Sequence, residues 1–146
     1  MKEKIVNPVA GIYPATEDYV HAIEVTGADR ILYLSGTMGL EEDGSAPATL
    51  EDQLARVWSN IRRILAEAGM TTGNIIRVTS YLRDPGYAEM NQAARLAALG
   101  ERRVPTTAIV AQTLSEDWKI EIEVIAAAES APEAVACPAA HFSRLT

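Results

Sequence analysis

The sequence of 146 residues predicts an α+β fold in which two helices cover one face of a mixed sheet. Segments in which apolar and polar residues alternate predict strands, and a longer segment with apolar residues three and four positions apart predicts an amphipathic helix. The predicted order is two strands, a helix, a strand, a helix and two strands. A chain of this length is typical of a single domain, which we expect over residues 1–129.

The first two predicted strands are Val20–Val25 and Ile31–Ser35. Between them lie Gly27 and Asp29, and both residue types favour turns. Two strands joined by so short a turn are typical of a β-hairpin, so we expect these strands to pair with each other. An acidic loop with glycine and proline follows over residues 41–47.

The first helix is predicted to begin after Thr49, because a threonine followed three positions later by Asp52 approximates a capping box. Apolar residues then recur at helical spacing until Gly69, at positions 50, 54, 57, 61, 64 and 65. Trp58, on this helix, is expected to pack in the core. The sequence therefore predicts a long helix with one buried face.

A third strand is predicted over Ile75–Leu82, and Asp84 followed by Pro85 favours a second helix, which ends at Gly100. Two further strands follow, over residues 106–111 and 119–128. In the last strand the alternation is strict, so Glu121 and Glu123 share one face and the isoleucines between them face the other way. By itself this pattern is also typical of a half-buried strand with a solvated acidic side.

Composition narrows the function classes. The formal net charge of −7 opposes binding to nucleic acid or an anionic membrane, and no basic stripe interrupts that field. No apolar run reaches the ~18 residues of a membrane span, and the single cysteine excludes an internal disulfide, so we expect a cytoplasmic protein. The acidic loop lacks a full set of metal ligands and no phosphate-binding glycine motif is present, which predicts neither a metal nor an organic cofactor. Residues 130–146 form an Ala- and Pro-rich tail.

Several short motifs occur in a fixed order over residues 18–128: Asp18-Tyr-Val-His-Ala-Ile-Glu-Val25, Ile31-Leu-Tyr-Leu-Ser-Gly36, Gln53 with Asn60, Arg77-Val-Thr-Ser-Tyr-Leu-Arg-Asp84, Tyr87-Ala-Glu-Met-Asn91, Pro105-Thr-Thr107 and Lys119-Ile-Glu-Ile-Glu123. Together they resemble the Rid family of reactive intermediate deaminases, also called YjgF, RidA or L-PSP proteins. The resemblance implies a chorismate mutase-like fold, a homotrimer with clefts between subunits, and cofactor-free hydrolysis of enamine and imine intermediates.

The resemblance also implies site residues. Glu123 matches the family position that holds the attacking water and exchanges protons with the departing amine. The matching substrate-binding positions are Tyr19, Ser35, Gly36, Asn91 and Thr106. Each of these residues also has a local interpretation, such as a strand-face tyrosine or a helix asparagine, and only their combination favours a site.

The sequence departs from the family where the substrate carboxylate is bound. Pro105 stands where deaminase members carry an arginine, and proline offers neither charge nor an N–H donor. Arg102 and Arg103 precede it and are candidates for the lost carboxylate contact; the alternative is that both are surface charges. Three functions remain open: an imine hydrolase with altered substrate recognition, an idle or repurposed small-ligand binder of the same fold, and an endoribonuclease, which the charge disfavours.

Overall fold

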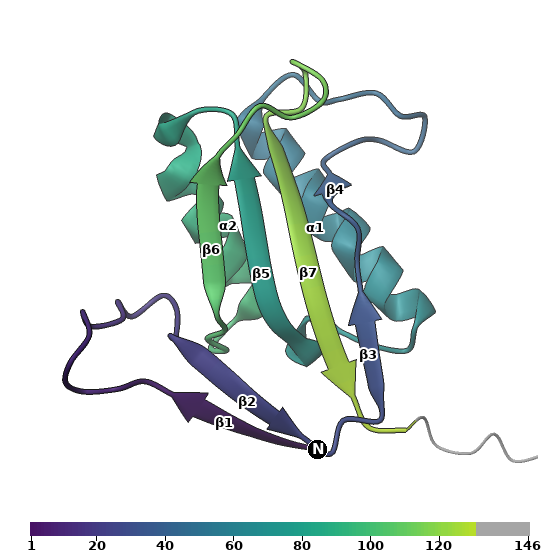
Figure 1. Ribbon diagram of the computed structural model, residues 1–146. Coiled ribbons are helices and arrows are strands. Elements are labelled where there is room, and N and C mark those ends of the chain that lie inside the picture. Colours follow the sequence, from purple (N-terminus) through teal and green to yellow (C-terminus); the bar gives the residue numbers. More distant parts are fainter. Residues whose placement is uncertain (131–146) are drawn as a thin grey trace, which may run out of the picture.

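The computed structural model describes residues 1–130 and contains one main sheet in the order β3-β7-β5-β6. Its strands are β3 (Arg30–Tyr33), β5 (Ile75–Leu82), β6 (Thr106–Val110) and β7 (Ile120–Ala128), and the short strand β4 (Thr37–Met38) also pairs with β7. Helices α1 (Leu50–Glu67) and α2 (Ala88–Leu99) both lie on one face of this sheet (Figure 1). The α+β prediction is therefore confirmed, including the mixed sheet: β5 and β6 run parallel and the other pairs antiparallel.

Helix α1 packs on the central strands through most of the apolar positions that the sequence indicated, but Ile64 is 42% exposed. The side chains of Val57, Ile61 and Leu65 are fully buried, and so are Ile122 and Val124 on β7. The predicted cap is present, because the backbone N–H of Asp52 donates to the Thr49 hydroxyl at 3.1 Å. Burial of this helix face supplies the main apolar core.

The pairing of β5 with β7 determines which side chains share the opposite face, which we call the outer face because neither helix covers it. Thr79 pairs with Glu123 and Tyr81 with Glu121. Their neighbours along each strand, such as Ser80 and Ile122, point toward the helices and are fully buried. The two glutamates therefore lie on the outer face, as their alternation predicted.

The predicted hairpin between the first two strands is wrong. Strand β2 (Ala22–Thr26) pairs with β1 (Lys2–Val6), which the sequence analysis did not predict, and β3 pairs with β7 instead. Gly27, with a φ of 70°, carries the chain out of β2 in a left-handed conformation that favours glycine. As a result β1 and β2 form a separate two-stranded sheet beside one end of the main sheet (Figure 1); we call residues 1–26 the arm.

Smaller differences concern element ends. The second helix opens with a 3-10 turn (Pro85–Tyr87), which Asp84 caps by accepting from the Gly86 N–H at 2.7 Å. Apart from Ser130, the predicted Ala- and Pro-rich tail lies outside the described residues. Within residues 1–130, no helix combines the length and the apolar character that crossing a membrane requires.

Candidate functional site

Glu121 and Glu123 line a pocket of 370 Å³ on the outer face. The pocket also contains Gly36, which precedes β4, and Tyr81 from β5. The remaining lining residues come from the loop after β6: Ala111, Gln112, Thr113 and Leu114. Glu123 is exposed and Glu121 is partly buried, so two carboxylates face a space that is open to solvent. Such an arrangement can bind a water molecule and transfer its proton.

Gly36 brings the backbone into direct contact with Glu121. A Cβ atom at this position would overlap with the Oε1 atom of the Glu121 carboxylate. Because glycine has no side chain, the carboxylate packs against the main chain and leaves Glu123 as the freer of the two groups. The structure thus places Gly36 and Glu123 in the lining of the same pocket.

Gln53 of α1 forms hydrogen bonds with the loop after β6, which lines the pocket. The Gln53 amide nitrogen donates to the carbonyl oxygens of Pro47 and Asp117 at 2.8 and 2.9 Å, and its carbonyl accepts from the Lys119 N–H at 3.0 Å. Gln53 is 2% exposed. A buried glutamine with all three contacts satisfied is a rigid support, so the loop after β6 is ordered by the helix side of the fold.

Arg83 holds the same loop from the end of β5. Its Nη1 atom donates to the backbone oxygen and the hydroxyl of Thr113, at 3.0 and 2.9 Å. The Thr113 hydroxyl in turn donates to the Trp118 carbonyl at 2.6 Å. Sequence reasoning missed Gln112, Thr113 and Tyr81 as pocket residues, because no local pattern shows which loop closes over the outer face.

Ser35 is exposed and lines a neighbouring pocket of 820 Å³ that adjoins the first at Gly36. Arg56, Asn60 and Arg63 of α1 form the opposite wall of this second pocket. Asn60 donates to the carbonyl oxygens of Met38 and Leu40 at 3.1 and 2.9 Å, which ties β4 to the helix. Ser35 therefore precedes Gly36 of the Glu123 pocket in the sequence, but its own side chain lines the neighbouring pocket.

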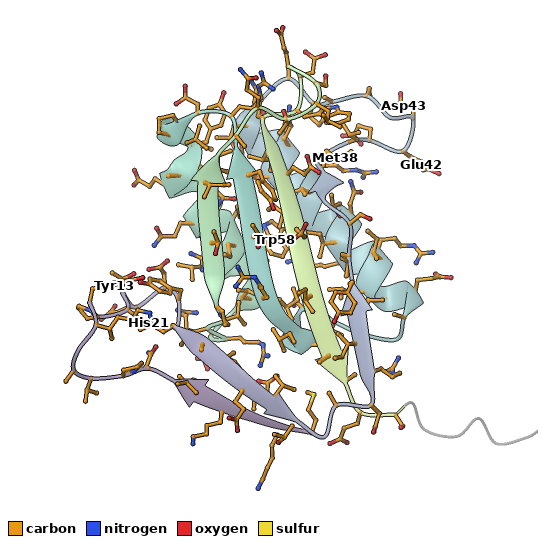
Figure 2. The ribbon with its side chains drawn as sticks, in the orientation of Figure 1. Tyr13, His21, Met38, Glu42, Asp43 and Trp58 are labelled. Atoms are coloured by element: carbon orange, nitrogen blue, oxygen red, sulfur yellow. The ribbon has the colours of Figure 1, made fainter. Side chains whose placement is uncertain are left out.

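Tyr19 lies on the arm, away from the glutamates of its own chain. Its ring contacts His21 edge to face, with centroids 5.8 Å apart, and the Nε2–H of His21 donates to the Tyr13 carbonyl at 2.9 Å. Figure 2 shows Tyr13 and His21 at the arm end of the molecule and Met38, two residues after Gly36, at the opposite corner. Within one chain, Tyr19 and Gly36 do not form one pocket.

The base of the arm is joined to α2 by an ion pair. Arg95 is buried, with 4% of its side chain exposed, and donates to the Asp18 carboxylate and carbonyl, both at 2.7 Å. Burial opposes ionisation of the Asp18 carboxyl, but hydrogen bonds from Thr16 and Arg95 outweigh it and lower its pKa below 3.8. The contact of Arg95 with Asp18 thus fixes the backbone directly before Tyr19.

Asn91 and Thr106 face away from the glutamates. Asn91 is 2% exposed on the buried side of α2, and its side-chain oxygen has no partner among the described residues. Thr106 pairs with Val78, whose side chain points toward the helices, and its hydroxyl donates to the Val104 carbonyl at 2.9 Å. Neither side chain lines the Glu123 pocket.

The two arginines before Pro105 are held by other partners. Arg102 forms a bidentate ion pair with Glu3 of β1, at 2.8 and 2.7 Å, and also donates to the Ile75 carbonyl. Arg103 donates to the carbonyl oxygens of Glu17 and Gly100 at 2.8 and 2.9 Å. Both link the arm to the end of α2, and neither lines the pocket with Glu123. Among residues 1–130 there is also no group of three or more His, Cys, Asp or Glu side chains arranged to hold a metal.

Comparison with known proteins identifies a family. The family model described as Endoribonuclease L-PSP matches residues 12–128. RutC family protein PH0854 of Pyrococcus horikoshii is 31% identical over 102 residues, which cover 68% of this chain and 80% of that protein. The Escherichia coli protein named "Putative reactive intermediate deaminase TdcF" is 28% identical over 112 residues, covering 74% of this chain and 84% of that protein. The fold matches the solved structure of the Rid family protein YyfB from Yersinia pestis, with a TM-score of 0.75 and 24% identity over 88% of this chain and all of that one.

Proposed function

The chain belongs to the Endoribonuclease L-PSP family, which includes the Rid and YjgF proteins, and from this membership we propose that it hydrolyses imine and enamine intermediates and releases ammonia. The observation that carries the proposal is the pocket in which Glu123 stands beside Gly36 and Glu121 on the outer face. The relative named as a reactive intermediate deaminase supports the same reaction class.

Hydrolysis of an imine needs few groups, because its carbon is already electrophilic. In the proposed reaction the substrate is the imine already protonated on nitrogen, and the Glu123 carboxylate accepts a proton from a bound water as the water oxygen bonds to the imine carbon and the C=N π electrons move to nitrogen. The resulting carbinolamine carries a hydroxyl and an amine on one carbon. Glu123 then returns its proton to the amine, the C–N bond breaks, and the hydroxyl gives its proton to the Glu123 carboxylate, which passes it to solvent; the products are a carbonyl compound and ammonia.

A second subunit completes the site in this proposal. Glu123 is exposed in the single chain, and a proton-transferring carboxylate gains from a drier surrounding. Tyr19 lies on the arm, away from Glu123 of its own chain, so a Tyr19 beside Glu123 has to come from another copy of the chain. We therefore propose a closed homotrimer with a cleft at each of its three interfaces. Light scattering at micromolar concentration tests this assembly, and a stable monomer would contradict it.

The reaction is tested with an imine generated in place by an L-amino-acid oxidase acting on L-leucine. Unreacted imine is trapped with semicarbazide, so that faster hydrolysis appears as less trapped product and faster ammonia release. We expect Glu123→Gln to lower kcat by roughly two to four orders of magnitude, as for a lost general acid or base. Glu121→Gln is the matched control, and we expect a smaller loss because its carboxylate packs against Gly36.

Equal rates for the wild type and Glu123→Gln would contradict the proposed role of Glu123. Failure of the wild type to accelerate hydrolysis of any imine would favour a small-ligand binder of the same fold. Cleavage of RNA at physiological salt is measured in parallel, since the family description names an endoribonuclease. The net charge of −7 leads us to expect no RNA cleavage.

A further inference from the structure

A groove of 580 Å³ lies between α1 and α2, on the side of the sheet opposite the outer face. Its floor contains Leu54 and Trp58 of α1, each 3% exposed. Its wall on α2 consists of Met90 and the alanines at positions 93, 94, 97 and 98. Because alanine side chains end at a methyl group, α2 does not fill the space beside Trp58. The volume lies within the range of ~300–1,000 Å³ that is typical of small-molecule sites.

The indole of Trp58 is a buried donor without an acceptor. Its Nε1 atom forms no hydrogen bond within residues 1–130. Buried side-chain N–H groups nearly always have an acceptor, because the contact with water that they lose is otherwise not replaced. Since Trp58 lines the groove, a ligand with an oxygen acceptor can supply this contact.

Arg62 adds a positive charge one helical turn away from Trp58. Residues four positions apart share one face of a helix, with Cβ atoms ~6 Å apart, and Arg62 also lines the groove. Its guanidinium forms neither a hydrogen bond nor an ion pair with residues 1–130, whereas the adjacent Arg63 donates to Glu67 at 2.8 Å. A carboxylate between the two side chains can therefore accept hydrogen bonds from both the indole and the guanidinium.

The groove is apolar from Arg62 toward Leu54 and Met90. Both helices run opposite to β5, because α1 leads into the start of β5 and α2 follows its end (Figure 1). Met90, near the start of α2, therefore lies at the same end of the groove as Leu54. Leu54 precedes Arg62 by eight residues, or ~12 Å along the helix axis, a length that suits an extended aliphatic chain of medium length. Glu51 also lines this end and would repel a second carboxylate.

We propose that the groove between α1 and α2 binds an aliphatic monocarboxylate of medium chain length. The carboxylate accepts from Trp58 and Arg62, and the chain lies along the alanines of α2. The unpaired indole N–H and the charge beside it select an anion, and Glu51 limits the ligand to one carboxylate. The groove is separate from the pocket that contains Glu123, so the proposal does not depend on the proposed reaction.

The test is calorimetric titration with octanoate, and with octylammonium as a probe of equal chain length and opposite charge. We expect the wild type to bind octanoate with a Kd below about 1 mM and octylammonium at least tenfold more weakly. Arg62→Gln and Trp58→Phe should each weaken octanoate binding by about tenfold, the loss expected for one hydrogen bond to a charged group. Arg63→Gln is the matched control, because Arg63 is exposed and lies outside the groove, and it should change the affinity by less than about twofold.

A second variant tests the location of the ligand. Ala97→Leu fills the groove from α2, and because Ala97 is exposed and leucine favours helices, the variant should fold, as circular dichroism will check. We expect it to lose octanoate binding. In a Trp118→Phe background, where Trp58 is the remaining tryptophan, octanoate should change the fluorescence.

Three results would each overturn the proposal: no octanoate binding by the wild type at millimolar concentration, equal affinity for octanoate and octylammonium, or equal effects of Arg62→Gln and Arg63→Gln. Unchanged octanoate affinity in folded Ala97→Leu or in Trp58→Phe would place the ligand elsewhere and would also contradict it.

Discussion

Replacing Gln53 with methionine should destabilise the protein although it preserves the volume of the side chain. Gln53 makes three hydrogen bonds to main-chain groups, two to the carbonyl oxygens of Pro47 and Asp117 and one from the Lys119 N–H. Methionine can replace none of them. Each hydrogen bond contributes on the order of 1 kcal/mol, so we expect a loss of about 3 kcal/mol in the free energy of unfolding. Gln53→Ala should cost more, because it also leaves a cavity beside a residue that is 2% exposed.

The assay is urea unfolding followed by circular dichroism, with all variants at one protein concentration because the proposed assembly makes stability depend on concentration. Gln92 of α2 provides the matched control: it is exposed, and its amide makes no hydrogen bond within residues 1–130. Gln92→Met should therefore shift the free energy by less than about 0.5 kcal/mol. If Gln53→Met is as stable as Gln92→Met, the reasoning that Gln53 holds the pocket loop is refuted.

Two further changes test the supports of the site. Asp18→Asn should lower the free energy of unfolding by about 1–3 kcal/mol at pH 7, because it weakens the contact with Arg95. Since the folded state lowers the pKa of Asp18 below 3.8, this stabilisation is present above that pH and is lost as the pH falls through the folded pKa. In urea unfolding, the difference in stability between the wild type and Asp18→Asn should therefore be smaller at pH 3 than at pH 7. An equal difference at both pH values would argue against the ion pair. Gly39→Ala should lower the free energy of unfolding by about 1–3 kcal/mol, because a Cβ atom there would overlap with the backbone oxygen of Gln53. A melting temperature equal to that of the wild type would show that the chain after β4 does not approach α1 so closely.

The sequence by itself determined the elements whose pattern is local. The apolar spacing of α1 and the alternation of β7 are properties of adjacent residues, and they correctly predicted the buried face of the helix and the outward face of Glu121 and Glu123. The same patterns, with the order of the short motifs, led to the family.

Pairing between strands was decided by the tertiary structure. Alternation shows which face of a strand is buried, but it does not show which strand lies along each edge. The short segment around Gly27 was compatible with a hairpin, yet β2 pairs with β1, because the contacts of Arg102 with Glu3 and of Arg95 with Asp18 hold the arm at the end of α2. These contacts join residues 99 and 77 positions apart, which no local pattern reveals.

The candidate site divides in the same way. The sequence indicated Gly36 and Glu123, and the tertiary structure added the loop after β6 to the same pocket. It also separated Tyr19, Asn91 and Thr106 from Glu123 within one chain and directed Arg102 and Arg103 to other partners. A side chain's type and face are encoded locally, whereas its neighbours across a pocket depend on which distant segments the core brings together. That is the physical reason why the sequence predicted the face on which Glu123 lies but not most of the residues around it.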